Sequence, residues 1–86
     1  MEIKKELILR KLGDEYIIVP IGKTIDEYNG LFNLSECGAF IFEKISAGLE
    51  REQIIPLLLE TYDIDKTTAE KDYDTFISTL REFGIV

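Results

Sequence analysis

The chain has 86 residues, of which 45% are hydrophobic and 31% are charged, a balance typical of a folded domain and not of a disordered tail. A chain of this length supports one small core and is too short for an enclosed active-site cavity of ordinary size, so we expect residues 1–86 to form a single domain. Its 17 acidic and 10 basic residues give a formal charge of -7, which repels phosphate backbones and argues against nucleic acid as a partner.

The residues needed for common catalytic chemistry are absent from the sequence. There is no histidine, so catalysis through Ser/His/Asp or Cys/His is excluded, and the usual nitrogen ligand of zinc or copper is missing. The six glycines occur singly and form no phosphate-binding loop. We therefore expect no catalytic activity from the chain alone, no metal and no cofactor.

Cys37 is the one cysteine, so an intramolecular disulfide is excluded. Because it falls in the first turn of an expected helix, the helix dipole would lower the pKa of its thiol, and a reactive thiolate is an alternative to a merely structural role. No basic neighbour in the sequence supports that alternative.

No apolar stretch approaches the roughly 20 residues needed to cross a bilayer. The N-terminal residues Met1 to Glu6 lack the hydrophobic region of a signal peptide. We expect a cytoplasmic protein with no membrane partner.

The first part of the chain predicts three short strands. Leu7–Leu12 and Glu15–Ile21 are separated by Gly13-Asp14, a pair suited to a tight hairpin. Gly30–Leu34 is the third predicted strand. Ser35 follows it directly as the N-cap of a helix, with no loop between strand and helix.

Three helices are predicted in the remainder. The first covers Glu36–Ala47, and the second covers about Arg51–Tyr62, in which Pro56 predicts either a frayed first turn or a kink. Asp65 is the predicted N-cap of the third helix. The apolar stripe of the third helix is Ala69, Tyr73, Phe76, Ile77, Leu80 and Phe83, and we expect its aromatic residues to be core. Ile85-Val86 are expected to fold back onto this core.

Strands followed by helices predict an α+β fold, with a three-stranded antiparallel sheet covered on one face by three helices. The segment Asn29–Ala39 is its most informative part, because so short a strand, flanked by turn residues, is expected at a sheet edge. An edge strand has unpaired backbone groups that can accept another chain, either a peptide or a second copy in a homodimer.

Four segments in this order resemble the PqqD-like family, the family of coenzyme PQQ synthesis protein D, over nearly the whole chain. They are E-Y-I-I-V-P-I-G (15–22), N-G-L-F-N-L-S-E-C-G-A-F-I-F (29–42), L-L-L-E-T-Y-D-I-D (57–65) and D-Y-D-T-F-I-S-T-L-R-E-F-G-I (72–85). The family's Leu-Asn-Glu at the strand-to-helix junction is here Leu34-Ser35-Glu36, and serine caps a helix about as well as asparagine.

The resemblance implies a small winged helix-turn-helix domain that serves as a noncatalytic recognition element, or peptide chaperone, for ribosomally made, modified peptides. It implies that the leader of the precursor peptide adds as a strand to the third strand, packs beside the third helix, and is presented to a modifying enzyme, often a radical SAM enzyme. Carried onto this chain, the peptide-binding residues are Gly30, Leu31, Phe32, Asn33, Leu34, Thr68, Lys71, Asp72 and Thr75.

The alternative is a winged-helix DNA-binding or transcriptional module, because the same architecture can place a helix in the major groove. Such a helix is expected to be basic, whereas the third helix here carries Asp65, Glu70, Asp72 and Asp74 at its start and in its first half. The acidic composition leads instead to the hypothesis that the leader, or the docking face of the enzyme, carries compensating lysines or arginines.

Overall fold

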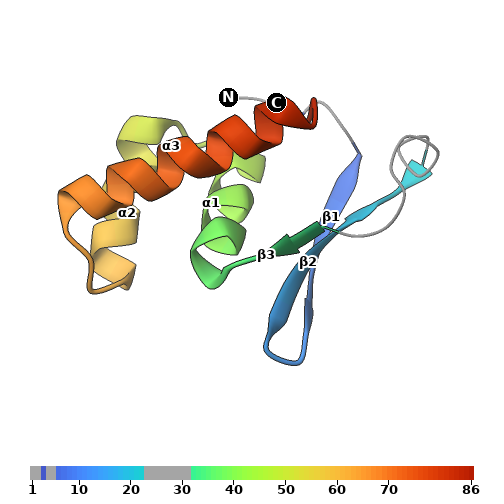
Figure 1. The fold of residues 1–86 in the computed structure, drawn as a ribbon, viewed down its shortest axis with the longest axis horizontal. Helices are drawn as coiled ribbons and strands as arrows, with labels where there is room; N and C mark the ends of the chain where they lie inside the picture. Colours follow the sequence, from blue (N-terminus) through green and yellow to red (C-terminus); the bar gives the residue numbers. More distant parts are fainter. Residues whose placement is uncertain (1–2, 4–5, 23–31) are drawn as a thin grey trace.

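The computed structural model of the chain describes residues 3, 6–22 and 32–86. The elements follow in the order β1 (Leu7–Leu12), β2 (Glu15–Pro20), β3 (Phe32–Leu34), α1 (Glu36–Ser46), α2 (Arg51–Thr61) and α3 (Lys66–Glu82). The sheet lies at one end of the molecule, and α1 is the helix that packs against all three strands (Figure 1). This arrangement confirms the predicted α+β fold and is compatible with a winged helix-turn-helix.

The sheet has the order β1-β2-β3, and both neighbouring pairs are antiparallel. Gly13 and Asp14 form the turn of the β1–β2 hairpin, in which Leu12 pairs with Glu15. Gly13 has a φ of 63°, a conformation that favours glycine, so the predicted hairpin is confirmed. β2 ends at Pro20, one residue before its predicted end.

β3 pairs with residues 16–18 at the start of β2. It covers Phe32–Leu34 of the predicted strand, while Gly30 and Leu31 lie outside the described residues. In β2 the adjacent residues Ile17 and Ile18 point to opposite faces, yet they are only 5% and 0% exposed. The sheet is therefore buried on both faces at this point, which explains why its central strand is continuously apolar rather than alternating.

Both predicted helix caps are confirmed. The Ser35 hydroxyl accepts a hydrogen bond from the Gly38 N–H at 3.0 Å, and the Asp65 carboxylate accepts one from the Thr68 N–H at 2.7 Å. The hydrogen bond from Thr68 lowers the pKa of Asp65. α1 ends at Ser46, one residue before its predicted end.

α2 is continuous through Pro56 and begins in an ordered turn. The Glu50 N–H donates to the Gln53 side-chain oxygen, and the Gln53 N–H donates to the Glu50 carbonyl, each at 2.9 Å. The alternative of a frayed first turn is therefore wrong.

The helices share one core, which the C-terminal residues complete. It consists of Ile41, Ile45, Ile54, Ile55, Leu58, Ala69, Tyr73, Ile77, Leu80 and Ile85. Two aromatic residues of the predicted stripe of α3 are not in it, because Phe76 is only partly buried and Phe83 is 46% exposed. Both lie on the side of α3 that faces the β3–α1 junction, where side chains do not fill the space. Val86 packs on the core beside Ile85, so the predicted return of the C-terminus is confirmed.

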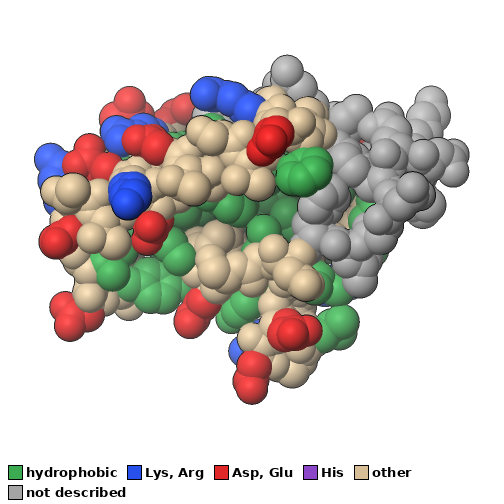
Figure 2. All heavy atoms as spheres, viewed as in Figure 1, with side chains coloured by type: hydrophobic (Ala, Val, Ile, Leu, Met, Phe, Trp, Pro, Cys, Tyr) green, Lys and Arg blue, Asp and Glu red, His purple; other side chains and the backbone are tan. Residues whose placement is uncertain are grey.

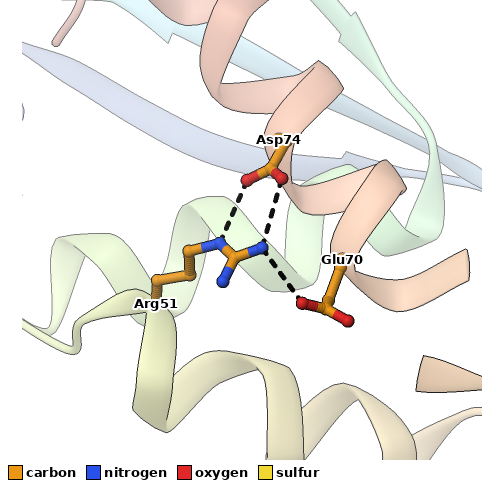
Figure 3. Close-up of polar contacts among 3 residues, drawn as sticks. All are labelled: Arg51, Glu70 and Asp74. Carbon is orange, nitrogen blue, oxygen red and sulfur yellow. Dashed lines mark hydrogen bonds and ion pairs between the residues drawn. The ribbon is translucent and has the colours of Figure 1, made fainter. Parts of the chain in front are cut away.

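A charged cluster joins α2 to α3 (Figure 3). The Arg51 guanidinium donates to both carboxylate oxygens of Asp74, at 3.0 and 3.2 Å, and to Glu70 at 3.4 Å. Its central carbon also lies 5.8 Å from the ring centroid of Tyr73. Two of the acidic residues of α3 are thus occupied in holding the helices together.

Candidate functional site

Two adjoining cavities, of about 420 and 350 Å³, lie between α3 and the β3–α1 junction. Ser35, Phe76 and Thr79 line both cavities, so we treat them as one groove and call it the β3–α3 groove. The polar end is completed by Cys37, Gly38, Ile41, Lys71, Asp72 and Thr75. The apolar end is completed by Ile18, Asn33, Leu34, Leu80, Phe83 and Ile85. Figure 2 shows apolar side chains in the hollow beneath α3, on this side of the molecule.

The junction of β3 and α1 sets the shape of the groove. Ser35 is the one residue between the two elements, and its cap on Gly38 fixes the direction in which the helix leaves the strand. A Cβ atom at Gly38 would lie 3.2 Å from Cε1 of Phe76 and 3.3 Å from the Ser35 hydroxyl oxygen, closer than side-chain carbons usually come. Glycine at this position therefore lets α1 approach α3 without displacing the Phe76 ring into the groove.

The backbone of β3 borders the apolar end. Within the described part of the chain β3 pairs with β2 only, so its other edge has N–H and C=O groups without a strand partner. Asn33 and Leu34 of this strand line the groove. An extended segment lying along β3 would thus meet backbone partners on one side and the wall of α3 on the other.

The two ends differ in chemistry. Lys71 and Asp72 place opposite charges at the polar end, whereas the apolar end contains the exposed ring of Phe83. Burial raises the pKa of the Cys37 thiol, and the nearby Asp72 carboxylate raises it further. Both effects favour the protonated thiol and argue against the alternative of a reactive thiolate, which was based on the helix dipole.

Five of the predicted site residues line the groove: Asn33, Leu34, Lys71, Asp72 and Thr75. Phe32 is in β3, beside them in the chain. Thr68 is not among the lining residues; it lies in the first turn of α3, where its N–H is bound by the Asp65 cap. Gly30 and Leu31 lie outside the described residues.

Three residues that line the groove, Phe76, Thr79 and Phe83, were not predicted as site residues. The two phenylalanines were assigned to the core, and the predicted site residues of the third helix ended at Thr75. The signal was present in the spacing. Asp72, Thr75, Phe76 and Thr79 follow one another at i, i+3, i+4 and i+7, which places them on one face of a helix, next to the core face.

The described residues contain no group of three or more His, Cys, Asp or Glu side chains arranged to hold a metal ion. Among the helices of the described residues, none is both long enough and apolar enough to span a membrane.

Two solved structures share this fold. One is that of TbiB1 in complex with the TbiA(beta) leader peptide, which is 21% identical, with a TM-score of 0.78 over 99% of this chain and 93% of that one. The other is lasso peptide synthetase B1 complexed with the leader peptide, 18% identical, with a TM-score of 0.76 over 98% of this chain and 93% of that one. No curated protein matches the chain. The sequence profile of coenzyme PQQ synthesis protein D matches residues 15–86, which span β2 to the C-terminus, and the chain therefore belongs to the PqqD family.

Proposed function

We propose that this protein is a noncatalytic adaptor that binds the leader of a ribosomally made precursor peptide and presents it to a modifying enzyme. The observation that carries the proposal is that one edge of β3, which has no strand partner among the described residues, lies along the β3–α3 groove. The leader would add to the sheet as a fourth strand beside β3 and seat its alternate side chains in the groove.

The groove offers the two kinds of contact that strand addition needs. Backbone hydrogen bonds to β3 contribute about 0.5 to 1.5 kcal/mol each, and apolar side chains of the leader would be buried against Phe76 and Leu34. After the costs of association and of ordering the peptide are subtracted, binding of roughly micromolar strength is expected.

The comparisons support the same function. Both solved structures are complexes with a leader peptide, in proteins that share the fold over nearly their whole length. Membership of the PqqD family supports a partner role in peptide modification, for which we propose a radical SAM enzyme as the recipient.

The direct test is a titration of the chain with a fluorescently labelled synthetic leader of the precursor encoded next to its gene. We expect saturable binding at micromolar concentrations. No binding at tens of micromolar would overturn the proposal. Sedimentation of the free and bound chain would also show whether the β3 edge pairs with a second copy when no peptide is present.

Proline substitutions in β3 test the docking edge. Successive N–H groups of a strand point to opposite sides, so one of Phe32 and Asn33 donates toward β2 and the other toward the free edge. We expect one of Phe32→Pro and Asn33→Pro to weaken leader binding about tenfold or more with helix content unchanged, and the other to destabilise the sheet. If both variants bind the leader as the wild type does, the edge is misassigned.

Duplex DNA is the control ligand, since the winged-helix alternative predicts a salt-sensitive complex. The groove face of α3 carries Asp72 beside Lys71, and the chain has a net charge of -7, so we expect no complex at physiological salt. A salt-sensitive shift of duplex DNA would favour the alternative.

The same charge predicts a basic partner. If the leader or the enzyme carries compensating lysines or arginines, its affinity for the chain should fall as salt rises. Affinity unchanged between low and high salt would contradict this part of the proposal.

A further inference from the structure

A second hollow lies on the other side of α1 from the β3–α3 groove. Glu36, Phe40 and Glu43 line it at i, i+4 and i+7, whereas Cys37 and Ile41 line the groove. With about 3.6 residues per turn, these two sets point in different directions from the helix axis. A ligand of the hollow and a ligand of the groove would therefore not compete for the same side of α1.

The walls of the hollow are aromatic and its rim is acidic. Tyr16 of β2, Phe40 of α1 and Tyr62 at the end of α2 bring three rings together, with Glu36 and Glu43 beside them. The rings of Phe40 and Tyr62 meet edge to face, with centroids 5.6 Å apart and an interplanar angle of 79°. We call this site the aromatic hollow.

Two lysines of the chain already lie near two of these rings, at distances typical of cation–π contacts. Lys44 Nζ lies 5.1 Å from the ring centroid of Phe40, and Lys11 Nζ lies 5.6 Å from that of Tyr16. Neither lysine is among the residues that line the aromatic hollow itself.

The two glutamates place negative charge on the rim of the hollow. Neither Glu36 nor Glu43 forms an ion pair with any described residue. Burial raises the pKa of the Tyr62 phenol, and both carboxylates raise it further. A cation that entered the hollow would therefore meet two carboxylates that have no ion pair with a described residue, and the faces or edges of three rings.

We propose that the aromatic hollow receives an arginine side chain from a basic surface of the partner protein. The volume, about 100 Å³, suits one side-chain head group and falls short of the roughly 300 Å³ at which small-molecule sites begin. A planar guanidinium can stack on a ring while donating to two carboxylates, which an ammonium group cannot do in the same way. That the partner is the peptide-modifying enzyme rests on the proposed function, whereas the preference of the hollow for a guanidinium does not.

The test titrates the ¹⁵N-labelled chain with N-acetyl-arginine methylamide and, as its neutral isostere, N-acetyl-citrulline methylamide. We expect the arginine compound to shift the amide signals of residues around Phe40 and Tyr62 at millimolar concentrations, and the citrulline compound to shift them much less. Equal shifts with both compounds, or shifts centred on Asp72 in the β3–α3 groove, would overturn the proposal.

Variants of the rim and the wall define the site. Glu36→Gln/Glu43→Gln should weaken arginine binding about tenfold, while the matched charge control Glu52→Gln/Glu82→Gln should leave it unchanged. Phe40→Leu keeps an apolar side chain but removes the ring, and should also reduce binding. Equal effects of the two double variants would show that net charge alone is responsible and would contradict the site.

The same variants separate this inference from the proposed function. Glu36→Gln/Glu43→Gln should bind the leader within about twofold of the wild type but associate at least several-fold more weakly with the modifying enzyme. Unchanged association with the enzyme would overturn the docking role. If N-acetyl-arginine methylamide binds the wild type but the leader does not, the proposed function is wrong while the assignment of the aromatic hollow as an arginine site is supported.

Discussion

Two faces of α3 differ in what covers them, although they belong to the same helix. One face presents Ala69, Tyr73, Ile77 and Leu80 to α1, α2 and the C-terminus, and these side chains are buried, although Leu80 also borders the apolar end of the groove. The adjacent face presents Asp72, Thr75, Phe76 and Thr79 to the β3–α3 groove. Neighbouring residues of α3 thus have different roles, one set in the core and the other in the groove. Stability and peptide binding should therefore respond to different substitutions in this helix.

The largest expected effect is on stability. Leu80 is 3% exposed, and Leu80→Ala should lower the free energy of unfolding by about 2 to 5 kcal/mol through lost burial and a cavity. The adjacent Thr79→Ala, on the exposed groove face, should change it by less than about 0.5 kcal/mol. Urea unfolding of both variants measures the difference, and similar losses would contradict the division of the helix into two faces.

Phe76→Ala should have the next largest effect, this time on binding. Phe76 lines both ends of the groove and is partly buried, so its removal should weaken leader binding about tenfold and destabilise the fold less than Leu80→Ala does. Leu59→Ala on α2, an exposed apolar side chain outside the groove, is the matched control and should bind normally. Calorimetric titration of each folded variant gives the comparison. Unchanged binding by Phe76→Ala would show that the leader does not reach the groove.

Asp72→Asn should produce a smaller effect, on the reactivity of Cys37. The carboxylate of Asp72 raises the pKa of the thiol, so its removal should lower that pKa and speed alkylation by iodoacetamide a few-fold at a fixed pH near 8. Asp74→Asn, on the side of α3 that contacts Arg51, should not change the rate of alkylation. In the wild type, bound leader should slow the same reaction, since the Cys37 thiol lines the groove. An unchanged rate in Asp72→Asn would place the carboxylate too far from the thiol to act on it.

The smallest effect concerns the cap of α3, which belongs to neither face. The hydrogen bond from Thr68 lowers the folded-state pKa of Asp65 below the value of 3.8 for a free aspartate. The stabilisation is therefore complete above that value and is lost as the pH falls through the lower folded-state pKa. Asn caps without titrating, so Asp65→Asn should show a shallower loss of stability below about pH 4, with Glu52→Gln as control. Parallel pH profiles for Asp65→Asn and the wild type would contradict the assignment.

Local interactions made much of the fold predictable. The caps at Ser35 and Asp65 each join residues three apart in the sequence, and the Gly13-Asp14 turn joins adjacent strands, so short sequence patterns contain the necessary information. The buried face of α3 was predicted for the same reason, because it repeats at the helical period.

What the sequence did not predict depends on contacts between distant segments. Periodicity gives the direction of Phe76 and Phe83 from the helix axis but not whether another element covers them, and in the structure the space beside them is a groove. The contact between Arg51 and Asp74 joins residues 23 apart and follows only from how α2 packs on α3. Thr68 lies one turn before Asp72 on the same face of α3, so periodicity alone does not show that the residues lining the groove begin only at Lys71.

The passage from β3 to α1 through Ser35 alone has a mechanical consequence. A longer connection would absorb a tilt of the strand, but a single capped residue transmits it to the first turn of the helix. Any reorientation of β3 when a peptide docks would therefore move Glu36, on the rim of the aromatic hollow. The peptide-binding edge proposed for β3 and the rim of the aromatic hollow are thus mechanically linked through one residue.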